Sequence, residues 1–219
     1  MASWMVHFRI ADRIMDKIPN VVEVPYIVGN IGPDCGEPNE DWSQFTPPTN
    51  ISHWSDGNKS TIDYEKFFDS HLKMETDFEK WSFYLGYYIH LLTDVMWSKN
   101  IAKPTMEKWK EEFSKNSDFI WVVKKDWYDL DHFFLKNNPE FRTFEIFSNI
   151  VIFPNKYLEY YSETAIIKQI KYITRFYLSE HDNLEREYTY LSEEAMSKFV
   201  EEASDEIMIE LKKKNIIMS

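Results

Sequence analysis

Hydrophobic residues recur at helical spacing along most of this 219-residue chain. In the first segment His7, Ile10, Ile14 and Ile18 fall on one stripe of a helix that Ser3 can cap and Pro19 closes. Because His7 belongs to that stripe, we expect its side chain to point inward. Further helical patterns predict helices at roughly 61–75, 77–98, 104–115, 117–136, 139–153, 155–180 and 191–214.

Between about residues 20 and 60 the helical pattern gives way to glycine and proline. The segment holds most of the prolines and four of the five glycines, Gly29, Gly32, Gly36 and Gly57. Loops of such length without secondary structure are usually functional or disordered. Disorder is disfavoured by the apolar side chains in this one, Trp42, Phe45, Ile51 and Trp54. We therefore predict a long, ordered, functional loop with room for one short helix.

Composition narrows the fold class further. The chain is 43% hydrophobic and 17% aromatic, carries the single cysteine Cys35, and contains no uninterrupted apolar run that could cross a membrane. Disordered chains, disulfide scaffolds and proteins with stable membrane insertion are excluded on these grounds. The prediction is an all-α, single-domain multi-helix bundle spanning residues 1–219.

The net charge and the N-terminal sequence predict which binding partners are disfavoured and in which cellular compartment the chain is expected. A formal net charge of -12 at pH 7 opposes docking on nucleic-acid backbones or on anionic lipid by long-range attraction. The first residues lack the basic and apolar regions of a secretory signal, so the chain is expected to be cytoplasmic.

An aromatic helical segment around His90 and Asp94 holds the first candidate chemistry. The two side chains are four residues apart, so they point the same way and could grip one cation through imidazole nitrogen and carboxylate oxygen. Alternatively, Asp94 could only hydrogen-bond its neighbour inside the core. Gly86 lies four residues before His90, where a glycine costs about 1 kcal/mol against alanine, which suggests a close approach there.

Three more residues could join this pair. His7 lies on the apolar stripe, although a histidine there is more often a satisfied core residue. Asp34 ends the constrained sequence GNIGPD, where a simple Asx turn is the alternative. His53 follows the loop's prolines and could equally be a surface histidine. Three histidines and two aspartates together suit zinc better than calcium or magnesium.

The remaining histidines carry weaker signals. His71 and His181 lie among charged residues and are predicted to be at the surface, while His132 stays unassigned.

Four stretches of the sequence, in order and approximate spacing, resemble the zinc-dependent phospholipase C family. They read WMVH at residues 4–7, GNIGPDCGEPNEDWSQFTPP at 29–48, SHW at 52–54 and FYLGYYIHLLTD at 83–94. The resemblance covers about half the chain and implies a mostly helical single domain with a metal cluster in a cleft. Single-strand-specific fungal nucleases are structurally related to this family.

The resemblance also assigns roles to individual residues. It implies that His7 is a ligand of one metal, that Asp34 and His53 are ligands of another, that His90 is a helix-borne ligand, and that Asp94 bridges the two metals. Asp34 also matches the residue proposed as general base in the family.

Two features depart from the family pattern. Trp4 is internal here, whereas the best-studied members chelate zinc through a mature N-terminal tryptophan. The third metal's ligand positions read Asn100, Glu107 and Glu111, so a third zinc is not expected; the two glutamates could instead hold a harder cation or form an ordinary exposed face. Two zinc ions are therefore the expected complement.

The predicted function is a metal-dependent, phospholipase C-like hydrolase of phosphoric esters, acting on a small phosphoester or a phospholipid head group. In this hypothesis the metals activate a water molecule, Asp34 takes its proton, and aromatic residues wall the cleft, with Tyr87, Trp42, Phe45 and Trp54 as candidates. Core packing is the simpler role for most of those rings. The alternative is a non-catalytic, metal-stabilised helical binding protein, in which a metal only pins the long loop to the helices. Nucleic acid is disfavoured as a substrate by charge.

Overall fold

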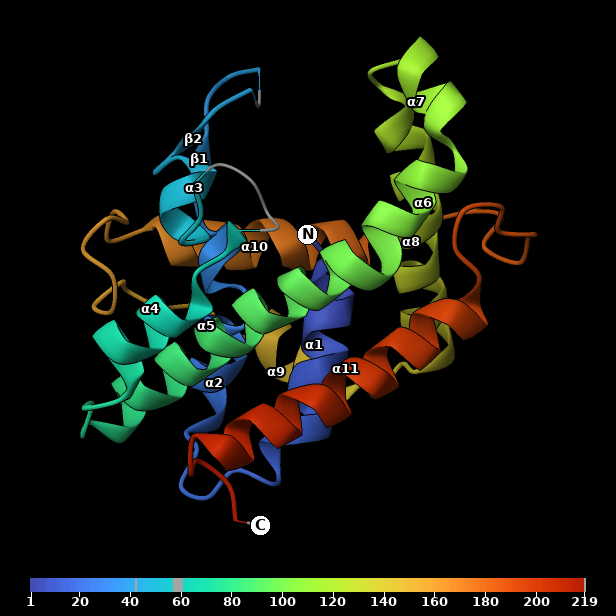
Figure 1. The fold of residues 1–219 in the computed structure, drawn as a ribbon. Helices are drawn as coiled ribbons and strands as arrows, with labels where there is room; N and C mark the ends of the chain where they lie inside the picture. Colours follow the sequence, from blue (N-terminus) through green and yellow to red (C-terminus); the bar gives the residue numbers. More distant parts are fainter. Residues whose placement is uncertain (42, 57–60, 219) are drawn as a thin grey trace.

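The computed structural model describes residues 1–41, 43–56 and 61–218, and these form a helical assembly with one small two-stranded sheet (Figure 1). The helices are α1 (Trp4–Met15), α2 (Glu23–Gly29), α3 (Thr49–Ser52), α4 (Tyr64–Phe67), α5 (Phe78–Trp97), α6 (Lys103–Lys108), α7 (Lys110–Lys115), α8 (Phe119–Asn137), α9 (Arg142–Ser148), α10 (Ala165–Leu178) and α11 (Glu193–Lys213). Strands β1 (Glu37–Pro38) and β2 (Phe45–Thr46) are antiparallel, with Glu37 opposite Thr46. The predicted all-α, single-domain fold is confirmed.

Helix α5 lies at the centre of the molecule and contacts α1, α2, α4 and α11 (Figure 1). Its first turn is capped by Asp77, whose carboxylate accepts hydrogen bonds from the backbone N–H groups of Glu79 and Lys80. Every residue from Ser82 to Asp94 is buried. A helix buried on all sides, rather than along one stripe, fits the continuous apolar and aromatic sequence of this segment.

Two glycines bring α2 and α5 into direct contact. A Cβ atom added at Gly86 would lie 2.1 Å from the carbonyl oxygen of Tyr26, and one added at Gly29 would lie 2.1 Å from the carbonyl oxygen of Phe83. Neither position has room for a side chain. The prediction that Gly86 serves a close approach is therefore confirmed, and the partner is α2.

The segment predicted as one long ordered loop contains more secondary structure than expected. It contains two short helices, α2 and α3, together with the β1–β2 pair and a 3₁₀ turn at Gly32–Asp34. Pro25 does not prevent α2, because it lies in the first turn, where the backbone N–H group has no helical partner. Trp42 and Gly57 lie outside the described residues.

The later helices match the predictions unevenly. The predictions for 77–98, 117–136 and 191–214 are confirmed by α5, α8 and α11, and the predicted helices 77–98 and 104–115 are linked by a π-helical turn at Ser98–Ala102. Those for 139–153 and 155–180 are wrong in extent, because residues 149–164 are not helical. The Asn155 side chain accounts for this: its amide bonds the carbonyls of Leu158 and Tyr161 and the backbone N–H groups of Tyr157 and Leu158, replacing helical bonds.

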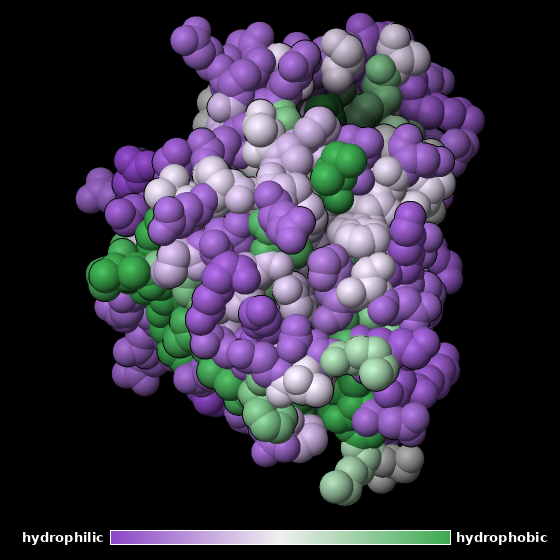
Figure 2. Space-filling model, turned by 90° about the vertical axis from the view of Figure 1, so that its left-hand side faces the viewer, coloured by the Kyte–Doolittle hydropathy of each residue, from purple (hydrophilic) through white to green (hydrophobic). Residues whose placement is uncertain are grey.

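Most apolar side chains are gathered in one core. The face turned to the viewer in Figure 2 is covered mainly by hydrophilic side chains, with hydrophobic ones in separate patches. None of the helices in the described ranges combines the length and apolar character needed to cross a membrane.

Candidate metal centre

The five residues singled out from the sequence come together in the interior. His7 comes from α1, Asp34 from the 3₁₀ turn, His53 from the residue after α3, and His90 and Asp94 from α5. All three histidines and Asp94 are at most 2% exposed. Segments far apart in the sequence therefore converge on one buried cluster of imidazoles and carboxylates.

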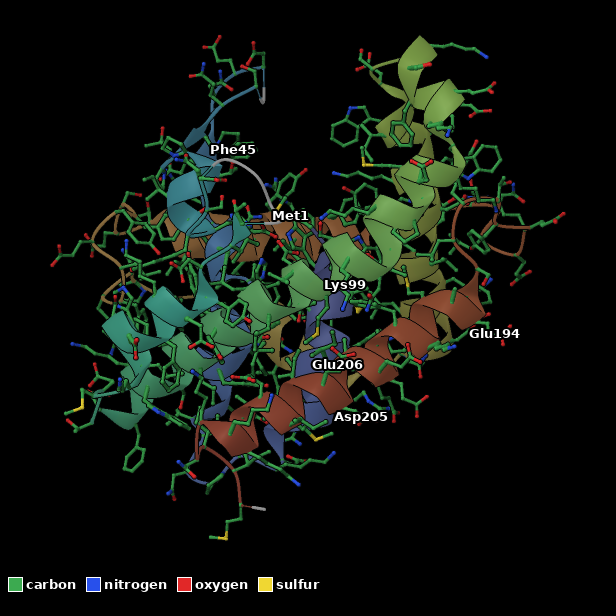
Figure 3. All side chains as sticks on the ribbon, in the orientation of Figure 1. Met1, Phe45, Lys99, Glu194, Asp205 and Glu206 are labelled. Atoms are coloured by element: carbon green, nitrogen blue, oxygen red, sulfur yellow. The ribbon has the colours of Figure 1, made fainter. Side chains whose placement is uncertain are left out.

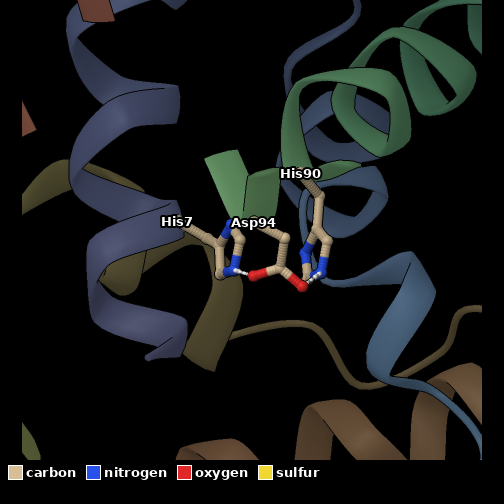
Figure 4. Close-up of side chains that lie close together, drawn as sticks. All are labelled: His7, His90 and Asp94. Atoms are coloured by element: carbon tan, nitrogen blue, oxygen red, sulfur yellow. Dashed lines mark ion pairs between the residues drawn. The ribbon is translucent and has the colours of Figure 1, made fainter. Parts of the chain in front are cut away.

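Asp94 lies at the middle of the cluster. Its Oδ1 atom is 3.6 Å from Nε2 of His7, and its Oδ2 atom is 3.7 Å from Nε2 of both His53 and His90. The backbone N–H group of Ala2 also donates a hydrogen bond to Oδ1, at 2.8 Å. Figure 4 shows one carboxylate oxygen facing His7 and the other facing His90. The two imidazole rings are stacked on each other, with centroids 3.8 Å apart.

Two imidazoles are oriented by bonds on their far nitrogen atoms. Nδ1 of His90 lies 2.7 Å from the carbonyl oxygen of Asn30, at the end of α2, so Nδ1 carries the proton that it donates. Nδ1 of His53 lies 3.1 Å from the carbonyl oxygen of Thr49. In both rings Nε2 is then left unprotonated in the neutral form and turned toward the carboxylates, as in metal-ligating histidines.

The atoms that face one another in the cluster lack hydrogen-bond partners. Among the described residues, the Nε2 atoms of His7, His53 and His90 and the Oδ2 atom of Asp94 are buried without one. Leaving such groups unsatisfied is costly unless something else binds them. Ligand atoms on neighbouring corners of a tetrahedral zinc site are about 3.3 Å apart, close to the 3.3–3.7 Å separations seen here. The donor set therefore fits zinc.

The cluster can be divided into two overlapping groups. His7, His90 and Asp94 offer ligand atoms within 4.8 Å of one another, and so do Asp34, His53 and His90. Asp34 reaches the second group through Oδ1, which is 3.3 Å from Nε2 of His53. Each group offers three ligand atoms, which is the number that a catalytic zinc site takes from its protein. Nε2 of His90 is counted in both groups and can bind a metal in only one of them at a time.

Electrostatics in the cluster favour ionised Asp34 and Asp94 and a neutral His90. Burial and the neighbouring His7 lower the pKa of His90 to about 3. Burial alone would raise the pKa of Asp34, but the neighbouring imidazoles of His53 and His90 bring it well below its ordinary value. The pKa of Asp94 is also well below its ordinary value, because burial is outweighed by the amino group of Met1 and by His7. These are the protonation states that metal ligands require.

Tyrosine hydroxyls hold the backbone that carries Asp34 and His53. Tyr161 donates to the carbonyl oxygens of Gly32 and Pro33, at 2.8 and 3.1 Å, and Tyr87 donates to the carbonyl oxygen of Ser52. Tyr161 belongs to segment 149–164, which is not helical although helical spacing predicts helices there. Its hydrogen bonds to Gly32 and Pro33 cannot be predicted from the sequence, because a side chain that bonds a distant backbone carbonyl leaves no spacing pattern.

Trp4 has a role that the sequence did not reveal. Its indole Nε1 donates a hydrogen bond of 2.9 Å to Oδ2 of Asp34, so the two oxygens of that carboxylate face different partners. Trp4 is therefore placed at the site by its side chain, although it is internal in the chain.

Asp131 on α8 anchors the N-terminal end of α1. It accepts hydrogen bonds from Ser3 and Tyr177, both at 2.8 Å, and Tyr177 in turn accepts one from the backbone N–H group of Met5. Asp131 is fully buried, and burial raises its pKa to about 7 despite the bonds from Ser3 and Tyr177.

The raised pKa predicts a pH-dependent stability. In the unfolded chain this carboxyl ionises near 3.8, so between about pH 4 and pH 7 the folded state holds more protons than the unfolded state. The contribution of Asp131 to folding is therefore largest at the acid end of this window and is lost as the pH rises through it. We expect the free energy of unfolding of wild type, measured relative to Asp131→Asn by urea denaturation, to fall as the pH is raised from 4 to 7. A difference that is independent of pH would contradict this assignment.

Two further sequence predictions concern the surface, namely the glutamates Glu107 and Glu111 and the histidine His71. Glu107 and Glu111 are exposed and paired with Lys110 and Lys115, which matches the ordinary exposed face. The surface prediction for His71 is wrong: the ring is half-buried against Phe67, Trp54 and Tyr84.

His132 is buried and stacks on the exposed His181, with centroids 3.5 Å apart. Among the proposed wall residues, Phe45 lines a cavity beside Asp34, whereas Trp54 and Tyr87 pack against Phe67 in the interior.

Comparison with known proteins gives one match. A family model described as zinc dependent phospholipase C matches residues 6–213, nearly the whole chain. No curated protein and no solved structure matches the sequence.

Proposed function

The chain belongs to the zinc-dependent phospholipase C family, and from that premise we propose that it is a metal-dependent hydrolase of phosphoric esters whose zinc ions are held by His7, Asp34, His53, His90 and Asp94. The observation that supports this assignment best is the set of buried, unpartnered atoms, three imidazole nitrogens and one carboxylate oxygen, that face one another. Zinc bound there supplies a Lewis acid for a phosphoryl oxygen and lowers the pKa of water.

Asp94 is proposed to serve two cations at once. Its two oxygens face different imidazoles, Oδ1 toward His7 and Oδ2 toward His53 and His90. The hydrogen bond from the Ala2 N–H group fixes the rotation of the carboxylate. His90 offers Nε2 to both groups of ligands, and the hydrogen bond from its Nδ1 to the carbonyl oxygen of Asn30 fixes the orientation of the ring.

Asp34 is proposed to take the proton from the attacking water. Its low pKa keeps it ionised over the physiological range, which is the protonation state that a general base requires. The bond from the Trp4 indole occupies one side of Oδ2 and holds the carboxylate at the edge of a cavity that it helps to line. Asp34 is thus placed where a substrate and the ligand cluster meet.

This cavity, which adjoins the centre at Asp34, is proposed as the substrate site. It has a volume of about 280 Å³ and is lined by Trp4 and Asp34 and by residues of α8 and α10. Met1 and Phe45, both labelled in Figure 3, also line it. A closed structural metal site would have no need of an adjoining cavity, which favours catalysis over the metal-stabilised binding protein.

The proposal is tested by loading the protein with zinc, measuring metal content by elemental analysis, and assaying a chromogenic phosphodiester, a phosphomonoester, a phospholipid and single-stranded DNA. We expect hydrolysis of at least one phosphoester, and we expect Asp34→Asn to lower kcat at least 100-fold, the usual size of a general-base contribution. Asp205→Asn, an exposed position on α11 (Figure 3), is the control for removing one carboxylate. Zinc-loaded protein that hydrolyses none of these, while chelation lowers its Tm, would support the binding-protein alternative instead.

A further inference from the structure

Residues 153–163, which lie between α9 and α10 (Figure 1), form a closed segment that we call the strap. The backbone N–H group of Asn155 donates a hydrogen bond of 2.9 Å to the carbonyl oxygen of Glu163. The side-chain amide of Asn155 donates to the carbonyl oxygens of Leu158 and Tyr161, at 2.7 and 2.9 Å. Four apolar or aromatic side chains of the strap are buried, those of Phe153, Tyr157, Leu158 and Tyr161. The strap is therefore an ordered element of the fold, although it is not helical.

The strap is anchored on α5. The ring of Tyr157 stacks on that of Phe83, with centroids 4.1 Å apart, and its hydroxyl donates a hydrogen bond of 2.8 Å to the carboxylate of Glu79. The hydroxyl of Tyr84 donates to the carbonyl oxygen of Tyr157, also at 2.8 Å. Because α5 carries two of the five candidate ligands, the strap is fixed relative to the centre of the cluster.

From this anchor the strap reaches the two short turns that carry the other loop-borne ligands. Tyr161 donates to the carbonyl oxygens of the two residues before Asp34, at 2.8 and 3.1 Å. The hydroxyls of Tyr160 and Tyr87 lie 2.9 Å apart, and Tyr87 donates its proton to the carbonyl oxygen of the residue before His53, so Tyr160 donates to Tyr87. Adjacent residues of the strap thus support both turns.

The ligands differ in the support that their own secondary structure gives them. His7, His90 and Asp94 belong to α1 and α5, which have 12 and 20 residues. Asp34 ends a 3₁₀ turn of three residues, and His53 follows the four-residue helix α3. Helical turns this short are not stable on their own in water. The 3.3 Å approach of Asp34 to His53 therefore depends on bonds from the rest of the fold, and the strap supplies several of them.

We infer that the strap controls the exchange of one of the two metal ions. The ion bound by Asp34 and His53 is held firmly only while Tyr160 and Tyr161 keep the two turns in place. The ion bound by the helix-borne ligands is held independently of the strap. This inference rests on the metal site of the proposed function and adds a means of regulating it, because loosening the strap converts a two-ion centre into a one-ion centre. Tyr160 and Tyr161 are positioning residues, which act on the metal through the backbone of its ligands.

Release of zinc tests the inference without turnover. Zinc-loaded protein is mixed with an excess of the chelating dye 4-(2-pyridylazo)resorcinol, and the absorbance of the complex reports the zinc released per chain over time. We expect wild type to release two ions in two phases. Tyr161→Phe should accelerate the fast phase at least tenfold, the lower end of the effect of residues that support metal ligands, and leave the slow phase unchanged. His53→Ala should lack the fast phase, which assigns that phase to the loop-borne ligands.

Tyr188→Phe is the matched control, because the Tyr188 hydroxyl also bonds a backbone carbonyl oxygen, that of Leu184, in the segment between α10 and α11. It should release zinc at the wild-type rates. Tyr160→Phe is a second, independent variant and should also accelerate only the fast phase. Circular dichroism establishes that each variant is folded before the dye is added.

Three results would overturn the inference: a single phase of release from wild type, a fast phase that Tyr161→Phe leaves unchanged, or equal acceleration of both phases. None of them bears on hydrolysis. Protein that exchanges its two ions as expected but hydrolyses no phosphoester supports the inference and overturns only the catalytic part of the proposed function. Protein that binds no zinc overturns both.

Discussion

Asp94→Asn should lose most of its zinc after dialysis, whereas His53→Ala should retain at least the ion held by His7 and His90. The reason is geometric: both carboxylate oxygens of Asp94 lie 3.6–3.7 Å from ligand nitrogens, and His53 contacts only one of the two ligand groups. An amide has one poor ligand oxygen in place of two charged ones. Loss of a shared ligand weakens two sites together, so the expected fall in zinc affinity exceeds the 10–100-fold that is typical for supporting residues.

Elemental analysis of the two variants, dialysed side by side with wild type, is the measurement. Asp205→Asn again controls for removal of one negative charge, and circular dichroism establishes that each variant is helical before its metal is counted. Full and equal zinc content in Asp94→Asn and His53→Ala would show that Asp94 does not bridge.

Gly86→Ala should have the largest effect on stability. The added Cβ would lie 2.1 Å from the Tyr26 carbonyl oxygen and 2.8 Å from the backbone nitrogen of Asn30. Neither atom can rotate away as a side-chain tip could, so α2 and α5 must separate. Overpacking in a core costs about 1–3 kcal/mol, and an obstruction by backbone belongs at or above the upper end. For a chain of this length, about 3 kcal/mol lowers Tm by roughly 6–12 °C.

Gly36→Ala is the matched control for the loss of a glycine. There an added Cβ would meet Phe45 and Pro47 at 3.3 Å, an overlap that a small shift relieves. Thermal unfolding followed by circular dichroism compares the two variants with wild type. If Gly86→Ala unfolds at the wild-type temperature, the close contact between α2 and α5 is not as tight as described. A reduced affinity for zinc in Gly86→Ala is expected too, since Asn30 follows α2 and orients His90.

Much of this architecture could be predicted from the sequence because helical periodicity is a local signal. The longest helices, α5, α8 and α11, were predicted within about two residues of their ends. Segment 149–164 was assigned to helices because its apolar spacing resembles theirs. Helix is disfavoured there by Pro154, which has no backbone N–H group, and by the side-chain amide of Asn155, which offers the backbone alternative partners.

The five candidate ligands were predicted because each is a polar residue in an apolar or constrained stretch, which is a rare combination. Their supporting residues could not be found in the same way. Trp4, Tyr161 and Asp131 act through one or two hydrogen bonds to partners at least 30 residues away, and nothing in their neighbouring sequence indicates which partners they meet. Only the folded chain shows that these residues belong to the site.

The hydrogen bonds from Tyr161 to the carbonyl oxygens of Gly32 and Pro33 determine how early during translation the site can form. These partners are separated by 129 and 128 residues. A ribosome makes all five candidate ligands well before it reaches this tyrosine, so an emerging polypeptide carries the ligands without the bonds that fix the Asp34 turn. Under the proposed function, zinc can therefore be held in its final arrangement only after about three quarters of the protein has been translated.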